Sequence, residues 1–200
     1  EALAEILTGE VNPSGKLSET FPLCLEDTPS YGTLNTPLVS RYEEGLDVGY
    51  RYYDSYGIPV AFPFGHGLSY SDFDYSGLKV DAEGQQAKVA FSLKNVSACD
   101  GKEVCQLYIH PLNAYVYRPE QELKAFAKQA VKAGKTGKVG FTLTAADFAY
   151  YSTAKDGWTT DDGFYEIRIG ASSRDIRLKA LVKIADGKLE FVKEVPVVEK

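Results

Sequence analysis

The sequence is poor in the residues from which metal centres and disulfide frameworks are built. It has two histidines, three cysteines, one tryptophan and no methionine. Neither a Cys-x-x-Cys pair nor carboxylates at ligand spacing accompany His66 or His110, so we predict no metal site and no cofactor. The three cysteines, Cys24, Cys99 and Cys105, are an odd, widely spaced set rather than a disulfide framework. They favour the cytoplasm slightly over secretion, and we expect Cys105, within an apolar run, to be a small buried hydrophobe.

The chain also lacks long apolar runs and an excess of positive charge. No stretch approaches the roughly 18 apolar residues that a membrane-spanning helix needs, so we predict no membrane partner. The net charge is −6, and no basic stripe is present to neutralise phosphates, which argues against a nucleic-acid partner. An acidic surface is compatible with a neutral substrate such as a sugar, although it does not select one.

The first residues are typical of a helix. Leu3, Ile6 and Leu7 share one helical face, and Gly9 is placed to cap the carboxyl end. No capping residue precedes the run, residue 1 is a Glu, and the chain has no Met. We therefore expect the chain to begin inside a helix, as a proteolytic product or an excised piece would.

Residues 1–74 are rich in loop-forming residues. They contain six of the nine prolines and a dense set of tyrosines. The turn signal Val11–Lys16 leads into a short strand that we predict at Leu17–Phe21. A segment this poor in regular elements cannot easily bury a core alone, so we interpret it as the end of a larger domain.

From residue 75 the hydrophobic pattern has a period of two, which predicts strands. Val89, Phe91 and Leu93 share one face of such a run. Further runs predict strands in these ranges: 104–110, 122–131, 139–143, 164–169 and 176–184. About seven short strands separated by turns are typical of an immunoglobulin-like sandwich, and the missing Cys-Trp-Cys signature favours a fibronectin-like version. We predict a mainly β chain, in which a fibronectin type III-like domain at 75–200 follows the loop-rich end of an α/β sandwich domain at 1–74.

Several blocks resemble glycoside hydrolase family 3, in the order that the family shows. The likeness begins at Asn12-Pro13-Ser14-Gly15-Lys16-Leu17 and is most specific at Phe62-Pro63-Phe64-Gly65-His66-Gly67-Leu68-Ser69-Tyr70. The other blocks are Thr20–Pro22, Tyr42–Asp54, Gly101–Ile109, Arg118-Pro119, Glu122–Lys124 and Ile169–Ile176. The block Tyr42–Asp54 resembles the β-glucosidase branch more than the β-xylosidase branch.

The resemblance implies a part of a retaining β-glucosidase that hydrolyses terminal, non-reducing β-D-glucosyl residues, with β-xylosides as the alternative substrate class. It also implies that the nucleophilic Asp and the acid/base Glu lie in an amino-terminal barrel and in the preceding part of the α/β domain. This chain would then be a structural, domain-closing segment without catalytic residues, inactive in isolation. Its partners would be the barrel and acid/base domain of the same enzyme and a β-glucoside or oligosaccharide.

Two acidic sites invite a catalytic interpretation that their context disfavours. Ser71-Asp72-Phe73 is similar to the family's nucleophile motif, but it follows the block that ends at Tyr70, where the α/β domain gives way to the sandwich. We therefore predict Asp72 to be a surface carboxylate at a strand start. Glu43 and Glu44 are adjacent, and neighbours on an extended chain point to opposite faces, so they cannot readily flank one bond.

Tyr42 and Glu44 are the candidate substrate-binding residues. The face of Tyr42 suits a pyranose ring, and Glu44 matches the family block, although packing and structural roles remain open for both.

Three other side chains have a structural and a functional interpretation. His66, between two glycines, fits a tight turn that its imidazole fixes by bonding to the backbone better than it fits a proton donor. Arg51 resembles a structural ion-pair former, with Asp47 or Asp54 as partner. Trp158, in a polar loop between strands, either binds polysaccharide or caps the sandwich edge. A stand-alone carbohydrate-binding β-sandwich module that uses Trp158 or the tyrosine-rich loop therefore remains the alternative function.

Overall fold

A computed structural model describes residues 1–33, 38–39 and 41–192. In these ranges, two short α-helices and two 3₁₀-helices accompany the strands: α1 (Ala2–Thr8), η1 (Leu25–Asp27), α2 (Tyr50–Ser55) and η2 (Ala145–Phe148). The strands are β1 (Phe21–Pro22), β2 (Val60–Phe62), β3 (Phe73–Glu83), β4 (Gln86–Asn95), β5 (Gly101–Pro111), β6 (Glu122–Val131), β7 (Thr136–Thr144), β8 (Tyr150–Ser152), β9 (Gly157–Thr159), β10 (Gly163–Ser172), β11 (Asp175–Ala185) and β12 (Lys188–Val192). Within the described ranges, no helix is long and apolar enough to cross a bilayer.

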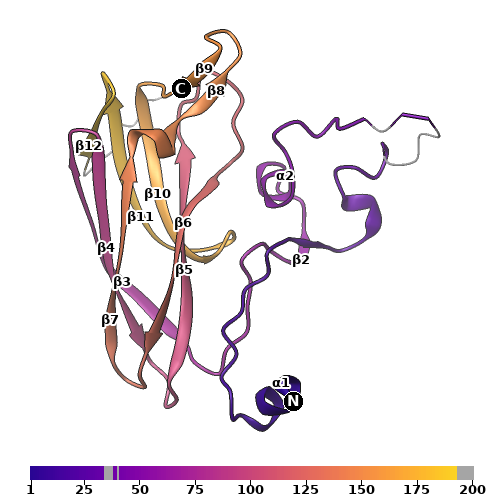
Figure 1. Cartoon of the computed structure of the whole chain (residues 1–200), viewed down its shortest axis with the longest axis vertical. Helices are drawn as coiled ribbons and strands as arrows, with labels where there is room; N and C mark the ends of the chain where they lie inside the picture. Colours follow the sequence, from indigo (N-terminus) through magenta and orange to yellow (C-terminus); the bar gives the residue numbers. More distant parts are fainter. Residues whose placement is uncertain (34–37, 40, 193–200) are drawn as a thin grey trace.

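Two antiparallel sheets form a sandwich from Phe73 onward (Figure 1). One sheet has the order β12-β11-β10-β5-β6 and the other has the order β3-β4-β7. The predicted inward faces are confirmed, since Val89, Phe91 and Leu93 on β4 are buried in the core between the sheets. Alternate burial on strands that pair in register is what period-two hydrophobicity requires. The fold is therefore mainly β with a fibronectin type III-like sandwich, as the sequence predicts.

Strand β5 is buried on both faces along its middle. Cys105, Leu107 and Ile109 face the core and are at most 1% exposed, which confirms the prediction for Cys105. Gln106 and Tyr108 point the other way and are also buried, at 3% and 0% exposure. Such double burial requires a second layer on the outer face of the five-stranded sheet.

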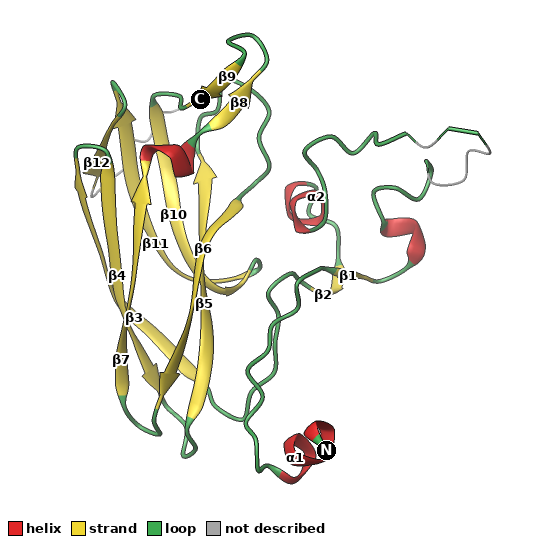
Figure 2. Ribbon diagram, in the orientation of Figure 1, coloured by secondary structure: helices red, strands yellow, loops and turns green. Residues whose placement is uncertain are grey.

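That layer comes from the described residues between 1 and 72 (1–33, 38–39 and 41–72), here called the amino-terminal segment, which are mostly loop (Figure 2). Helix α1 ends as predicted, with Gly9 in the left-handed conformation at φ 81°. The predicted strand at Leu17–Phe21 is wrong, because only Phe21–Pro22 pair with another strand, β2. Leu17 instead exchanges single backbone hydrogen bonds with Gly65 and His66, each 2.8 Å long.

Candidate functional site

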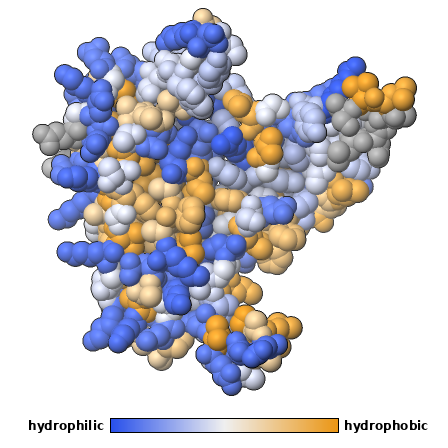
Figure 3. All heavy atoms as spheres, viewed as in Figure 1, coloured by the Kyte–Doolittle hydropathy of each residue, from blue (hydrophilic) through white to orange (hydrophobic). Residues whose placement is uncertain are grey.

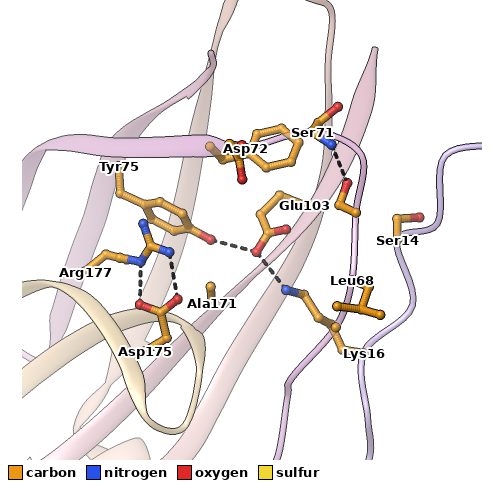
Figure 4. A pocket seen from close by; sticks show the side chains of 13 residues that line it. Ser14, Lys16, Leu68, Ser71, Asp72, Tyr75, Glu103, Ala171, Asp175 and Arg177 are labelled. Carbon is orange, nitrogen blue, oxygen red and sulfur yellow. Dashed lines mark hydrogen bonds and ion pairs between the residues drawn. The ribbon is translucent and has the colours of Figure 1, made fainter. Parts of the chain in front are cut away.

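A polar cavity of about 250 Å³ lies where the amino-terminal segment meets the end of the sandwich (Figure 4). Lys16 Nζ reaches across from the segment and lies 3.0 Å from Glu103 Oε1 on β5. The Tyr75 hydroxyl on β3 donates to the same oxygen at 3.0 Å. One carboxylate therefore joins the amino-terminal segment to both sheets of the sandwich.

Two further charged side chains at this cavity, Asp175 and Arg177, pair with each other. Arg177 on β11 contacts Asp175 through two nitrogens and lies 5.8 Å from the centre of the Tyr75 ring. Burial raises the pKa of Tyr75, and the nearby Glu103 carboxylate adds to the effect. A phenol held neutral and donating, between paired charges, is an arrangement that stabilises structure rather than one prepared for proton transfer.

The turn at Gly65 fits directly against β5. Gly65 has φ 79°, and a Cβ there would lie 2.1 Å from Gln106 Oε1. The Gln106 amide donates to the Gly65 carbonyl at 3.1 Å and to the Ala171 carbonyl at 2.9 Å, and its oxygen accepts the Tyr108 hydroxyl. Buried amides need such partners, so the glycine, the glutamine and the tyrosine form one unit.

His66 does not act through its imidazole as predicted. Its ring lies against Phe62, 5.2 Å between ring centres, and in the described part of the chain no hydrogen bond from that ring to the backbone is found. The backbone fixes the turn instead: His66 N–H donates to the Pro63 carbonyl and its carbonyl accepts from Leu17. The prediction of a structural role for this turn holds, but its mechanism is wrong.

Arg174 ties helix α2 to the sandwich. Its Nε lies 2.8 Å from Asp54 Oδ1, and its Nη2 donates to the carbonyls of Tyr53 and Ile58, each at 2.8 Å. Such a fork of donors satisfies the carbonyls at the end of a short helix while neutralising the carboxylate.

Tyr50, at the start of α2, adds packing to this junction. Its ring stacks on Phe64, with 4.6 Å between ring centres, and meets Tyr108 edge-on at 6.1 Å. The Tyr50 hydroxyl accepts a hydrogen bond from the Leu123 N–H of β6 at 2.8 Å. Tyr50 therefore packs against the sandwich, whereas Tyr42, Tyr56 and Tyr70 are exposed.

The predicted partners of Arg51 are wrong. Its guanidinium lies 3.2 Å from Glu122 on β6. Asp54 is occupied by Arg174, and Asp47, 8% exposed, accepts hydrogen bonds from the hydroxyls of Tyr56 and Tyr117. Sequence proximity suggested partners within the segment, whereas the fold supplies them from the sandwich.

Tyr42 and Glu44 lie before α2, outside the contacts between the amino-terminal segment and the sandwich described above. Tyr42 is 91% exposed. Glu44 is half-exposed, and its carbonyl accepts the Asp47 N–H at 2.9 Å, while Glu43 forms a loose 3.9 Å pair with Arg41. The substrate-binding roles of Tyr42 and Glu44 stay predictions.

Asp72 is exposed and directly precedes β3, which is the position predicted for it. Its backbone bonds with Ser97 and Val96 fix that corner. Across the described residues, no three His, Cys, Asp or Glu side chains lie close enough together to hold a metal ion.

Trp158 lies on β9 rather than in the predicted loop. Strands β8 and β9 form a two-stranded hairpin in which Trp158 pairs with Tyr151. The two rings meet edge-on at 6.0 Å, and Trp158 is 76% exposed. The indole is therefore presented to solvent on a regular element.

The opposite side of the amino-terminal segment exposes apolar side chains. A groove of about 610 Å³ runs between α1, the β1–β2 pair and the 66–68 turn. Phe21 and Phe62 are half-exposed, and Leu68 is 75% exposed, as are Leu3 and Leu7 on α1 at 70% and 75%. Hydrophobic surface is visible around α1 at the bottom of the molecule and along the segment on the right (Figure 3). Apolar surface gathered in this way is typical of an interaction site.

Asn95 of the Asn95-Val96-Ser97 sequon is fully buried. Its side-chain amide donates to the carbonyls of Cys99 and Val131 at 2.8 and 3.0 Å. Both amide protons are engaged in holding the 95–99 turn, so the folded chain does not present Asn95 as a glycan acceptor.

The sequence alone did not reveal how Asn12 works. Its Nδ2 donates to Ser71 and to the Asp100 carbonyl, and its Oδ1 accepts from Ser69 and from the Tyr70 N–H. The Asn-Pro-Ser-Gly motif was a signal that this asparagine matters, but its partners lie about 60 to 90 residues away.

Comparisons with known proteins agree with this architecture. The family model "Glycosyl hydrolase family 3 C-terminal domain" matches residues 1–70, and "Fibronectin type III-like domain" matches residues 103–173. Thermostable beta-glucosidase B of Acetivibrio thermocellus is 49% identical over 92% of this chain and 25% of its own length. Exo-alpha-(1->6)-L-arabinopyranosidase of Bifidobacterium longum is 42% identical over 96% of this chain and 26% of its own.

Solved structures give the same picture. The crystal structure of the Bifidobacterium adolescentis GH3 beta-glucosidase superposes with a TM-score of 0.89 at 39% identity, over 100% of this chain and 30% of that one. The chain thus spans between a quarter and a third of the length of these proteins.

Proposed function

Since the chain belongs to glycoside hydrolase family 3, of which it carries the carboxyl-terminal part, we propose that it acts as one part of a retaining β-glucosidase. In this proposal the catalytic nucleophile and the acid/base residue are supplied by the remainder of the enzyme. The chain closes the α/β domain, braces it with the β-sandwich, and does not hydrolyse glycosides in isolation.

The single observation that carries the proposal is the apolar groove on the amino-terminal segment. A strand pair as short as β1–β2 and a helix with no buried residue do not make a stable domain by themselves. Their apolar side chains face a common groove, which supports docking of further secondary structure from the same enzyme.

The sandwich gives that groove a rigid base. Lys16, Asn12 and Gly65 each connect the amino-terminal segment to the sandwich or to its first turns. The Lys16–Glu103 pair is charge-assisted and part-buried, and the Gln106 bond to Gly65 is buried, so these contacts hold the segment against the sandwich. Precise placement is what a domain next to a catalytic pair requires, since small displacements there are costly in rate.

Tyr42 and Glu44 are proposed to contact substrate from the turn before α2. The 91% exposure of Tyr42 supports this role, since it leaves the ring accessible to a ligand. In the assembled enzyme, Tyr42→Ala is expected to raise KM more than it lowers kcat, whereas loss of a purely structural residue would lower thermal stability.

The proposed substrate is a terminal, non-reducing β-D-glucoside. Relatives named as β-glucosidases support it, but the relative named as an exo-α-(1→6)-L-arabinopyranosidase is similar over nearly the same length. The test therefore compares a β-glucoside with an α-L-arabinopyranoside and a β-xyloside.

The test is reconstitution from two chains. This chain is co-expressed with the upstream portion of the same polypeptide, and hydrolysis of p-nitrophenyl β-D-glucoside, β-D-xyloside and α-L-arabinopyranoside is compared. Activity is expected only when both chains are present, highest with the glucoside, and proton NMR is expected to show the β-anomer of glucose first, as retention requires. Hydrolysis by this chain alone, or the α-anomer as first product, would refute the proposal.

A further inference from the structure

Another concave surface lies against the sandwich and shares no lining residue with the apolar groove. It has a volume of about 530 Å³, within the range of about 300–1,000 Å³ that is usual for small-molecule sites. Its walls come from the turn before α2, the connection between β5 and β6, and the β8–β9 hairpin. We name it the hairpin groove.

One wall of the hairpin groove is aromatic. Trp158 and Tyr151 form a cross-strand pair on one face of the hairpin. The Tyr151 hydroxyl donates to Asp156 at 2.5 Å. This hydrogen bond fixes the Tyr151 ring, which in turn packs edge-on against the Trp158 indole. An indole 76% exposed on a regular hairpin is a flat apolar surface available to a ligand.

The floor of the hairpin groove is charged and ordered. Glu122 on β6 contacts Arg51 at 3.2 Å, Arg118 at 2.6 Å and Lys124 at 3.6 Å. Arg118 also donates to the Phe148 carbonyl, and its side chain is only 4% exposed, so little of it faces a ligand. Arg51 and Lys124, at 35% and 18%, retain N–H groups that can donate to a ligand.

The opposite wall is held by hydrogen bonds to Asp47, which is buried. The Tyr117 hydroxyl donates to both carboxylate oxygens of Asp47, at 2.6 and 2.7 Å, so the two loops that carry Tyr117 and Leu46 do not move independently. A groove whose walls are tied by short hydrogen bonds is largely formed before a ligand arrives, which lowers the entropy cost of binding.

We propose that the hairpin groove binds a neutral gluco-oligosaccharide, with a pyranose ring on Trp158 and ring hydroxyls on Arg51 and Lys124. A pyranose has an apolar C–H face and a rim of hydroxyls that both donate and accept, which matches an aromatic wall beside a floor of charged donors. Arg51, Arg118 and Lys124 already have Glu122 as a negatively charged partner, so the ligand does not need to carry a negative charge. The choice of glucose as the sugar rests on the proposed function. The prediction that the groove binds a pyranose rests on its aromatic wall and charged floor alone.

The chain carries its own reporter, because Trp158 is its single tryptophan. Titration of the full chain with cellotetraose is expected to give a saturable blue shift of tryptophan emission that is insensitive to salt. Lys124→Met, which keeps the reporter, is expected to weaken binding about tenfold through loss of a charged donor. Tyr31→Ala, an exposed aromatic outside the groove, is the matched control and is expected to bind as the parent chain does.

A second measurement does not depend on fluorescence. Saturation-transfer NMR on the sugar protons is expected to show transfer with the parent chain and none with Trp158→Ala, whose exposed side chain can be removed without unfolding. Equal transfer with Trp158→Ala, no saturable shift at the solubility limit, or binding of acidic oligosaccharides only would overturn the inference. Sugar binding by this chain without activity of the two-chain enzyme would leave this inference standing and refute the proposed function.

Discussion

Lys16 and Glu103 are 87 residues apart in sequence, and Lys16 Nζ lies 3.0 Å from Glu103 Oε1. Their side chains are only 15% and 7% exposed, and Tyr75 donates to the same oxygen. The pair fastens the amino-terminal segment to the sandwich at the point where the two sheets meet. Its energetic role follows from burial, because a buried ion is costly when its partner is removed.

Glu103→Gln should therefore destabilise the chain by about 2–3 kcal/mol, since it leaves the Lys16 ammonium partly buried without a counter-charge. Urea unfolding followed by circular dichroism measures this loss. The double variant Lys16→Met with Glu103→Gln should recover much of the stability, because no unpaired ammonium remains and the glutamine oxygen can still accept from Tyr75. If the double variant is as unstable as the sum of the two single variants, the pair is not coupled.

Gly65→Ala should cost about 3 kcal/mol or more. Its Cβ would lie 2.1 Å from Gln106 Oε1, and Gln106 cannot move without breaking its bonds to Gly65 and Ala171. Gly84→Ala is the matched control: φ is also positive, at 62°, but no atom lies within 4 Å, so only the backbone cost of about 1–2 kcal/mol applies. Equal losses in the two thermal melts would show that the contact with β5 is unimportant.

Thiol labelling should distinguish one cysteine from the other two. Cys24 and Cys99 are exposed, whereas Cys105 is buried in the core. Burial raises the pKa of the Cys105 thiol to about 12, so its thiolate is scarce near neutral pH. An aromatic disulfide reagent should modify Cys24 and Cys99 in the native chain and Cys105 only on unfolding. Rapid native labelling of Cys105, located by peptide mass spectrometry, would contradict the described core.

Alkaline pH should destabilise the fold. Burial raises the pKa of Cys105 from 9.0 to about 12 and that of Tyr165 from 10.0 to about 12. Groups whose folded pKa lies above the unfolded value contribute stability that is complete below the unfolded pKa and is lost as pH rises through the folded pKa. The urea midpoint should be flat from about pH 7 to pH 9 and then fall towards pH 12. Cys105→Ala should lessen the fall at its onset, and an unchanged pH profile would count against the thiol as a cause.

The sandwich strands could be predicted because half-buried strands encode their inward face every second residue, as Val89, Phe91 and Leu93 do. The division at residues 74 and 75 stays a prediction, although β3 begins two residues earlier, at Phe73.

The contacts between the amino-terminal segment and the sandwich could not be predicted in the same way. Gln106 and Tyr108 occupy the outward positions of β5 and are nevertheless buried, because a distant segment covers them. Arg51 was matched to nearby aspartates, while its partner Glu122 lies on another element. Such contacts join segments that are far apart in sequence, so the local periodicity of hydrophobic residues does not predict them.

The proposed function depends most directly on the remainder of the enzyme docking on the apolar groove of the amino-terminal segment. Phe62→Asp places a charge in that groove, whereas Val96→Asp, at a side chain of similar exposure (47% against 48%) in the turn between β4 and β5, serves as the control. Sedimentation velocity of each variant mixed with the separately produced upstream portion of the enzyme measures complex formation. A complex is expected with the parent chain and with Val96→Asp, and none with Phe62→Asp; a complex of undiminished affinity with Phe62→Asp would show that the groove is not the docking surface.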